Sequence, residues 1–534
     1  MARVFFPQFK RGKDGVEVAL NSTILEHARR LGVEISSECG GRGICGRCVV
    51  RIARGAEALS PLTEAEREHG LSGGERLACQ ARVVKPADII VYVREVGKLS
   101  ILSETMEDRV RLDPFVVRRG EEVVWRGPCG EEVLDRYRGG IYGLAIDVGT
   151  TTVVFQIVDL EGGEVVETVA FKNPQAAYGD DVISRISYAM YNEGGLRELQ
   201  RAVLEAVNER LNEGLRDLIY EAVVVGNSTM RSIFFGVDVT TLGVLPFEPL
   251  IKGPLNVKAS KLGLRVNPNA NVYGAGLIGG HAGADALADI IASEIYKSDK
   301  PCMIVDIGTN GEVIVGNRDR MFSASCAAGG AYEGAAVSCG VGAVEGAIKS
   351  VRIVGGRAVY ETIGGKPPIG ICGSGLIDLL AEMLRNGIID ERGRFTSPER
   401  RFAVDEGRGI VITQEDVNQL LLARSGMSLD QRFLMKLFGT TVDELDRIFI
   451  AGAFGNYIDE ENAMFIGLLP EARGKVVKMG NGALAGARQM LISREKRREA
   501  EELIGRIRHV KPNEEDPEFF DKFVEGLRFG SWRV

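Results

Sequence analysis

The chain has 534 residues, of which 45% are hydrophobic and 26% are charged, and its formal net charge is −8. This length predicts about two to four domains, and the composition is typical of a globular protein. The negative charge argues against a nucleic-acid-binding surface. The sequence holds no uncharged apolar run of about 18 residues or more, and its first residues lack the apolar core of a signal peptide. We therefore expect no membrane span and a cytoplasmic protein.

Residues 1–95 predict a small domain of short strands with one helix. Ser22 and Thr23 offer a cap at the start of the helix, and Gly32 ends it. We expect strands at residues 4–6, 16–18, 49–52 and 89–93, and the helix at residues 24–31.

Four of the nine cysteines lie in this domain with the spacing C-x5-C-x2-C-x30-C. Cys39, Cys45 and Cys48 share one glycine-rich loop, and Cys79 lies in a separate segment. Three thiolates on a tight loop and one distant ligand suit a [2Fe-2S] cluster, and glycines let the backbone wrap around it and direct N–H groups at its sulfurs. In an intracellular chain such cysteines are more often metal ligands than disulfide partners. We predict that these four cysteines are the cluster ligands.

A structural zinc site, or four packed thiols, is the alternative to a cluster. A zinc ribbon needs two C-x2-C pairs, and this segment has one. The four-cysteine pattern resembles that of plant-type ferredoxins, from which it departs by one extra residue between Cys39 and Cys45. The resemblance covers residues 1–95 and implies a β-grasp, ferredoxin-like fold.

Residues 96–138 separate this domain from the rest of the chain. They are rich in charge, and two short apolar runs around Val116 and Val124 predict a strand or two without a sizeable core. Two interpretations stay open. One is a semi-ordered linker or reduced middle region that lets the cluster domain swing between electron donor and acceptor, and the other is a small extension packed on the next domain.

The segment from residue 139 onward contains an internal repeat. A buried apolar strand runs through Asp147 into a glycine and three threonines, followed by a second apolar strand. The same design recurs in the second half of the chain, where a strand through Asp306 leads to Gly308 and Thr309. Two such hairpins predict two halves of similar fold that face a cleft.

The residue types in the two hairpins indicate phosphate and metal chemistry. Glycine lets backbone N–H groups approach phosphate oxygens, and threonine hydroxyls donate to the same oxygens. The aspartates at the strand ends can hold Mg²⁺ through water or orient an attacking water; Asp147 is the candidate for the metal side and Asp306 for the water. One hairpin with such a turn is ordinary, whereas the pair is a specific signal. The predicted phosphate contacts are Gly149, Thr150, Thr151, Thr152, Gly308, Thr309 and Asn310.

A third motif follows an apolar strand near residue 450. Gly452 and Gly455 would admit an adenosine group against bare backbone, with Asn456 beside them. The sequence has no GxxxxGK[ST] motif, which excludes a P-loop. The three motifs resemble the phosphate-1, phosphate-2 and adenosine motifs of the superfamily of acetate and sugar kinases, heat-shock chaperone ATPases and actin. The resemblance implies a duplicated, actin-like (ribonuclease H-like) ATPase domain at residues 139–534, with halves at about 139–298 and 299–534.

Residues 223–230, 370–378 and 454–470, together with the ferredoxin-like domain, resemble the reductive activators of corrinoid proteins. This implies an ATP-hydrolysing electron-transfer protein that passes low-potential electrons from its [2Fe-2S] cluster to an inactive cob(II)alamin-bearing protein, restoring cob(I)alamin for methyl transfer. It also implies ATP and Mg²⁺ as ligands. Separately, we expect a homodimer formed through the ATPase domain. The implied partners are a corrinoid protein or corrinoid-dependent methyltransferase and a low-potential electron donor.

Two other classes of function stay open. Activators of 2-hydroxyacyl-CoA dehydratases share the ATPase fold and hold a [4Fe-4S] cluster between two subunits, and the loop at Cys326, with Cys339 after it, is similar to their cluster loop. They lack a ferredoxin domain, and Cys326, Cys339 and Cys372 also fit small buried residues in glycine-rich turns. A redox sensor that signals through its nucleotide state is the other class, although the chain shows no output domain. We also expect a charged helix at residues 493–507, in which the charge run at residues 494–499 forms a solvated face.

Overall fold

The computed structural model describes residues 2–7, 12–33, 35, 41–43, 48–69, 71, 74–93, 110–127, 130–308, 310–326, 330–334, 336–452 and 455–530. The chain forms two compact units. One consists of Met1–Gly97 and Pro174–Tyr191, and the other of Lys98–Asn173 and Asn192–Val534. In the part of the chain so described, no helix is long and apolar enough to cross a membrane.

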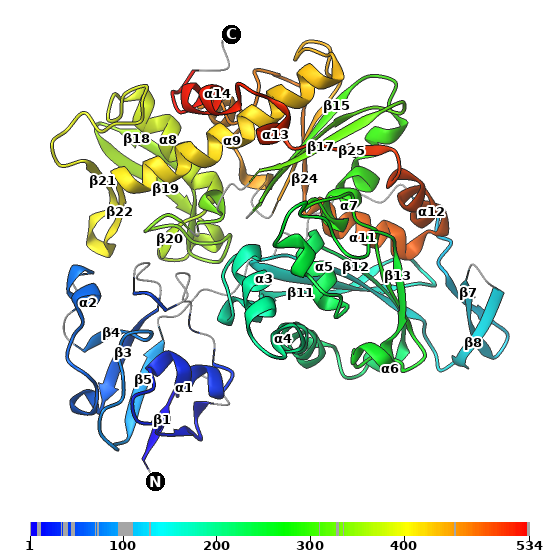
Figure 1. Ribbon diagram of the computed structural model, residues 1–534, viewed down its shortest axis with the longest axis horizontal. Coiled ribbons are helices and arrows are strands. Elements are labelled where there is room, and N and C mark those ends of the chain that lie inside the picture. Colours follow the sequence, from blue (N-terminus) through cyan, green and yellow to red (C-terminus); the bar gives the residue numbers. More distant parts are fainter. Residues whose placement is uncertain are drawn as a thin grey trace. The chain divides into compact units, whose positions relative to one another are not determined.

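The N-terminal unit is built on a five-stranded mixed sheet with the order β2-β1-β5-β3-β4 (Figure 1). β1 pairs with β5 in parallel, and the other neighbours are antiparallel. Helix α1 buries Ile24, Leu25 and Ala28 in the same core as the sheet. This arrangement confirms the predicted β-grasp, ferredoxin-like fold. Its strands are β1 Arg3–Phe5, β2 Val16–Glu17, β3 Val49–Arg54, β4 Glu75–Leu77 and β5 Ile89–Val93, and the helices of this unit are α1 Ile24–Arg30, α2 Glu64–Glu68 and α3 Val182–Tyr191.

The bounds of α1 follow from its sequence. Thr23 and Glu26 form a capping box, in which the Thr23 side chain accepts from the Glu26 N–H and the Glu26 carboxylate accepts from the Thr23 N–H at 2.6 Å. Gly32, with a φ of 64°, follows the helix end. His27 is fully buried and bonded on both ring nitrogens, because Nε2 accepts from the Ala19 N–H at 3.0 Å and Nδ1 lies 2.7 Å from the Thr23 carbonyl. The predicted cap and stop are confirmed, and His27 belongs to the core.

The second unit contains two six-stranded sheets of the same plan, with the orders β11-β10-β9-β12-β14-β13 and β24-β23-β15-β16-β17-β25. In each sheet a hairpin (β9–β10 or β15–β16) is antiparallel, and its first strand also pairs in parallel with a later strand (β12 or β23). This shared pairing confirms the duplicated, actin-like fold that the repeat predicts (Figure 1). We call the part built on the first sheet the first lobe and the part built on the other sheet the second lobe.

The strands of the first sheet are β9 Tyr142–Val148, β10 Thr152–Asp159, β11 Val165–Lys172, β12 Ile219–Val225, β13 Leu255–Lys258 and β14 Asn271–Gly274. Those of the second are β15 Cys302–Ile307, β16 Gly311–Gly316, β17 Met321–Cys326, β23 Ile448–Ala451, β24 Val476–Gly480 and β25 Ile507–His509. Small sheets contain β18 Ala347–Val354, β19 Arg357–Thr362, β20 Gly370–Ile371, β21 Arg401–Asp405 and β22 Ile410–Thr413.

The helices of this unit are α4 Gly195–Arg210, α5 Ser228–Phe234, α6 Ala259–Leu262, α7 Ala284–Ser293, α8 Gly373–Arg385, α9 Gln414–Phe438, α10 Glu460–Phe465, α11 Gly482–Ile492, α12 Arg494–Leu503, α13 Pro512–Glu515 and α14 Phe519–Gly526. Helices α7 and α11 contact each other, and their buried residues share one core with Ala145 of β9 and Ile304 of β15. The two lobes therefore meet around this helix pair.

Residues 110–136 form a three-stranded antiparallel sheet of β6 Val116–Arg119, β7 Glu122–Gly127 and β8 Gly130–Arg136. Val116, Val123 and Leu134 are buried in the core of the first lobe. The Asp113 backbone also pairs with the end of α11, since its N–H donates to the Ile492 carbonyl at 2.9 Å. Residues 110–127 and 130–136 thus form one strand more than the sequence predicts and contribute more to the core, and the two interpretations of residues 96–138 stay predictions.

The charged run near residue 495 differs from the expected solvated helix. Helix α12 ends at Leu503, and residues 507–509 form β25 instead. Arg497 is buried, and its Nη1 lies 2.5 Å from Oε1 of Glu221, whose side chain is fully buried. The guanidinium also lies 4.1 Å from the ring centroid of Phe115 and 4.3 Å from that of Tyr273. The prediction of a solvated face is wrong here, because the positive charge has a partner far away in the sequence.

We predict that Arg497→Met destabilises the protein by about 3–5 kcal/mol, because it leaves the buried Glu221 carboxylate unpaired. The double variant Arg497→Met, Glu221→Met should be much less destabilised, since no buried charge remains. Urea unfolding of the full chain measures both. Arg498→Met, on the exposed side of the same helix, is the matched control. Equal losses of unfolding free energy in the single and double variants would contradict the prediction.

Candidate nucleotide site and cluster loop

The turn that carries the first predicted phosphate motif, which we call the first phosphate turn, connects β9 to β10. Side chains from two other segments donate hydrogen bonds to it. A Cβ on Gly149 would lie 2.5 Å from the Thr152 carbonyl oxygen, so this turn requires glycine. Asn173 Nδ2 donates to the Gly149 carbonyl at 2.8 Å, and Asn227 Nδ2 donates to Oγ1 of Thr150 at 3.0 Å. Thr150 is buried, whereas Thr151 and Thr152 are partly exposed. The predicted residues of this motif thus form a fixed turn at the end of a central strand.

The second phosphate motif and the adenosine motif lie against each other. Asp306 lies near the end of β15, and Gly308 N–H donates to the Asn310 carbonyl at 3.2 Å. Gly452, with a φ of 115°, follows β23, and a Cβ on it would lie 2.6 Å from the Ile307 carbonyl oxygen and 3.2 Å from Oδ1 of Asp306. Gly455 and Asn456 begin the short helix η10, Gly455–Tyr457. Thr309, also predicted as a phosphate contact, lies outside the described residues.

Two hydrogen bonds link the lobes next to these motifs. Asn481 follows β24 in the second lobe, and its Nδ2 donates to Oδ2 of Asp147 at 2.9 Å. Its Oδ1 accepts from the Leu484 N–H at 2.8 Å and so caps α11, which fixes the orientation of the amide. Thr151 Oγ1 donates to Oε2 of Glu333 at 3.3 Å, again from the first lobe to the second. The structure therefore brings both aspartate motifs into one site.

Six carboxylates gather between the lobes, which we call the interlobe carboxylates. They are Asp147, Asp285, Asp289, Asp306, Glu312 and Glu333. Burial raises the pKa of Asp147 to about 7, the charges of Asp285 and Glu333 add to the shift, and the bond from Asn481 opposes it. Burial and the charges of Asp285 and Asp147 hold the pKa of Asp306 well above its usual range. Without a cation, part of this cluster therefore holds protons near pH 7.

Asp289 is the most confined of the interlobe carboxylates. It lies on α7 and is fully buried, and among the residues that the structure describes neither of its carboxylate oxygens has a hydrogen-bond partner. A Cβ on Gly482 of α11 would lie 2.3 Å from its Oδ1, and a Cβ on Gly486 would lie 2.1 Å from the Ala288 carbonyl oxygen. Glycines on α11 thus let the two helices approach closely, with this carboxylate between them. Burial and the nearby Asp306 and Asp285 raise the pKa of Asp289 well above its usual range.

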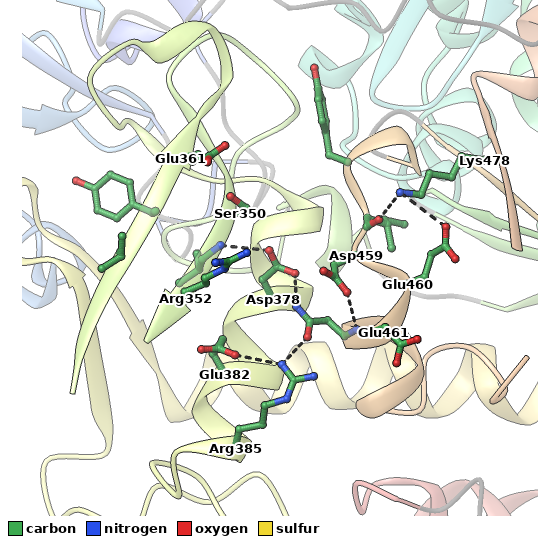
Figure 2. Close-up of a pocket in the computed structure, with 16 residues that line it drawn as sticks. Ser350, Arg352, Glu361, Asp378, Glu382, Arg385, Asp459, Glu460, Glu461 and Lys478 are labelled. Atoms are coloured by element: carbon green, nitrogen blue, oxygen red, sulfur yellow. Dashed lines mark hydrogen bonds and ion pairs between the residues drawn. The ribbon is translucent and has the colours of Figure 1, made fainter. Parts of the chain in front are cut away.

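A cavity of about 730 Å³ lies in the second lobe, and Tyr457, just after the adenosine motif, is part of its wall. Figure 2 shows Asp378, Glu382 and Arg385 along one side, on α8, opposite Asp459 at the start of α10. Burial raises the pKa of Asp378 to about 6. The lining residues are Ser350, Val351, Arg352, Val359, Tyr360, Glu361, Asp378, Glu382, Arg385, Tyr457, Ile458, Asp459, Glu460, Glu461, Asn462 and Lys478. With more carboxylates than cations, this wall suits hydrogen-bond donors of a ligand.

Two of the four predicted cluster ligands are described, and they lie together. The Sγ atoms of Cys48 and Cys79 are 3.2 Å apart. The hydrogen bond from Cys48 lowers the pKa of the Cys79 thiol to about 6, with a contribution from Gln80. Gln80 Nε2 donates to the Gly41 carbonyl at 2.8 Å and so ties the cysteine loop to the Cys79 segment. The ligands of an iron–sulfur cluster are thiolates, so a cysteine pair in which the thiolate form is favoured is suited to bind one. Cys39 and Cys45 lie outside the described residues.

The later cysteines have a different environment. Cys372 is fully buried, and its thiol donates to the Ile348 carbonyl at 3.3 Å. Burial, with the negative charges of Asp430 and Glu312, raises the pKa of Cys326 well above its usual range. Cys339 is partly buried. The thiols of Cys326 and Cys372 lack the electrostatic support for a thiolate that Cys79 has, because burial raises the pKa of both.

Sequence reasoning missed Asn481 and Asp289, and it left Glu333 and Asp285 without a role. The sequence does hold one local signal, because Asn481 follows an apolar strand and precedes a helix, where asparagine is a frequent cap. That signal predicts the cap but not the bond to Asp147, which joins residues 334 positions apart.

The fold and the site define a class: a [2Fe-2S] ferredoxin-like domain joined to a duplicated ATPase domain of actin-like fold. Models of known families match the ferredoxin-like domain and each half of the ATPase domain. Residues 10–84 match a 2Fe-2S iron-sulfur cluster binding domain, residues 142–298 the "RACo middle region", and residues 300–532 the "C-terminal domain of RACo the ASKHA domain".

Individual relatives cover nearly the whole chain. The corrinoid activation enzyme RamQ of Eubacterium limosum is 30% identical over 595 aligned positions, which cover 99% of both chains. A [Co(II) methylated amine-specific corrinoid protein] reductase of Methanosarcina barkeri is 26% identical and covers 69% of this chain and 73% of its own length. A solved structure titled "Reductive activator for corrinoid,iron-sulfur protein" is 30% identical, has a TM-score of 0.74 and covers 99% of this chain and 98% of its own. The chain belongs to the family of reductive activators of corrinoid proteins.

We predict that Asp289→Asn stabilises the protein more at pH 8 than at pH 5. The raised pKa means that the folded state binds this proton more tightly than the unfolded state. Stability is therefore lost as pH rises from the unfolded value towards the folded one, at about 1.4 kcal/mol for each pKa unit of difference. Asparagine removes that loss. Thermal unfolding at the two pH values measures the difference.

Asp319→Asn, at an exposed position, serves as the control for this measurement. A stability difference between Asp289→Asn and the wild type that is the same at both pH values would contradict the prediction, because it would mean that Asp289 does not bind its proton more tightly in the folded state.

Proposed function

We propose that this protein uses ATP to reduce the inactive cob(II)alamin of a corrinoid protein to cob(I)alamin. The observation that carries the proposal is the pair of interlobe hydrogen bonds, Asn481 to Asp147 and Thr151 to Glu333, which tie the first aspartate motif to the second lobe. A nucleotide held there would contact both lobes at once. Membership of the corrinoid-activator family supports the electron acceptor, and it favours this function over dehydratase activation.

In this proposal the nucleotide lies across residues from both lobes. Backbone N–H groups and hydroxyls at the two turns bind the phosphates, through Gly149, Thr150, Thr151, Thr152, Gly308, Thr309 and Asn310. Asp147 holds Mg²⁺ through water, and Asp306 orients the attacking water. Gly452, Gly455 and Asn456 receive the adenosine group, and the adjoining cavity, with its carboxylates on α8, offers acceptors for ribose and adenine donors.

The N-terminal domain supplies the electron. Cys39, Cys45, Cys48 and Cys79 would hold a [2Fe-2S] cluster, which when bound is a one-electron carrier. The protein's own residues tune this site, because the Gln80 amide lies 3.5 Å from Sγ of Cys79 and stabilises negative charge on the sulfur. A low-potential electron donor would reduce the cluster again after each transfer.

We also propose that the ATPase domain forms a homodimer.

ATP would act by changing how the lobes are joined. Mg²⁺ and phosphate groups compete for Asp147 and Thr151, which in this structure bond to Asn481 and Glu333. Replacing these bonds alters the relation of the lobes and so the surface offered to the corrinoid protein. Reduction of cob(II)alamin is uphill for a cellular donor, and ATP binding and hydrolysis would make it proceed by favouring the complex in which cobalt accepts an electron more easily.

Anaerobic reduction of a purified corrinoid protein tests the proposal. The activator, prepared with about two iron and two sulfide per chain, is mixed with reductant and cob(II)alamin-loaded partner, and the cob(I)alamin absorbance band is followed. We expect the band to grow only with MgATP, and Asp306→Ala to abolish that growth while leaving the iron content unchanged. Continued ATP hydrolysis with every corrinoid partner still oxidised would contradict the proposed acceptor.

Two cysteine variants serve as matched controls in the same assay. Cys79→Ser should lose the iron and the reduction together, whereas Cys339→Ser should keep both. Loss of iron in Cys339→Ser would instead support the dehydratase-activator type of cluster.

A further inference from the structure

Glu333 lies between the two phosphate turns, in a position that the proposed function leaves without a chemical role. It ends the short helix η7, Ala331–Glu333, in the connection from β17 to β18. Its Oε2 accepts the hydrogen bond from Thr151 in the first turn. A Cβ on Gly308, in the second turn, would lie 3.9 Å from its Oε1. One carboxylate group thus reaches both places where phosphate oxygens are expected.

The backbone that carries Glu333 is tightly fixed. Gly330 and Gly334 flank η7 with φ values of 65° and 81°, a conformation that favours glycine. A Cβ on Gly334 would lie 2.4 Å from the Val341 nitrogen, so the turn has no room to shift. Tyr332 is buried, and its hydroxyl donates to the Leu420 carbonyl of α9 at 3.2 Å. The carboxylate is therefore presented by a preorganised support, as a reacting group requires.

Four of the other interlobe carboxylates have a different proposed role or are more buried than Glu333. Asp147 is bonded to Asn481 and is the proposed metal-side ligand. Asp306 has the proposed role of orienting the water, and burial with the charges of Asp285 and Asp147 holds its pKa well above its usual range. Asp289 and Glu312 are buried, whereas Glu333 is partly exposed and can meet a water molecule.

We infer that Glu333 is the general base of ATP hydrolysis, an inference that rests on the proposed function. The phosphates take over the hydroxyl of Thr151, which frees the carboxylate for the water that Asp306 orients. The water oxygen forms a bond to the γ-phosphorus while the bond from that phosphorus to the bridging oxygen breaks. The electron pair stays on the β-phosphate of ADP, and the water proton passes to Glu333. Release of phosphate and of the proton returns the carboxylate to Thr151.

The variant Glu333→Gln keeps the shape of the side chain and removes the base. We expect hydrolysis of MgATP to fall on the order of 10²–10⁴-fold, the usual contribution of a general base. Affinity for MgATP, measured by calorimetry, should stay close to that of the wild type. The acidic limb of the pH–rate profile should also disappear. Glu345→Gln, an exposed glutamate in the same connection between β17 and β18, should behave as the wild type in all three measurements.

Chemical rescue separates a catalytic role from a structural one. Added formate should restore hydrolysis in Glu333→Ala in a concentration-dependent way. If the substitution only loosened the loop, formate would not restore hydrolysis. Full hydrolysis by Glu333→Gln would overturn the inference. So would a parallel loss of binding and hydrolysis without rescue by formate. If the wild-type protein itself bound ATP but did not hydrolyse it, the proposed function would fail first, and the two failures are distinguishable.

Discussion

The hydrogen bond from Asn481 to Asp147 is the interaction on which the rest of the site depends. It joins Asp147, near the end of β9 in the first lobe, to Asn481, the residue that caps α11 after β24 of the second lobe, over 2.9 Å. Asn481 cannot turn away from Asp147 without giving up the cap of α11, because its amide oxygen accepts from Leu484. The position of the first aspartate motif is thereby tied to the packing of α11 against α7, and so to the relation of the two lobes.

This tie crowds negative charge into one place. The interlobe carboxylates raise one another's pKa values, and within the described part of the chain Asp289 has no hydrogen-bond partner for either oxygen at the helix crossing. Such an arrangement costs stability when the carboxylates are ionised and is relieved by protons or by a divalent cation. In the proposed function, Mg²⁺ would replace protons here when the nucleotide binds, and the same exchange would weaken the bonds between the lobes. Chemistry at the phosphates and movement of the lobes would then be coupled through the same few side chains.

Local patterns were enough to predict the fold and much of the site. The two Asp-Gly hairpins, the glycines of Gly452 and Gly455 and the spacing from Cys39 to Cys79 each depend on neighbours close in the sequence. Partners distant in the sequence were not predictable in this way. Arg497 reads as one more charge in a solvated run, because nothing near it shows Glu221, which lies 276 positions away. Glu333 lies in a glycine-rich stretch that the sequence places no more closely than at the border of the nucleotide cleft or of a partner surface, because its partner Thr151 lies 182 positions away.

Proton release on nucleotide binding tests the central claim, that MgATP binds at the interlobe carboxylates, most directly. Calorimetric titrations of the protein with MgATP at pH 7, in buffers of different ionisation enthalpy, report the number of protons released. The account predicts a net release of protons, because the pKa of Asp147 is about 7 and that of Asp306 is held well above its usual range before binding. It also predicts a smaller release in Asp147→Asn. Binding heats that do not depend on the buffer would contradict the account, since they would place the nucleotide away from these carboxylates.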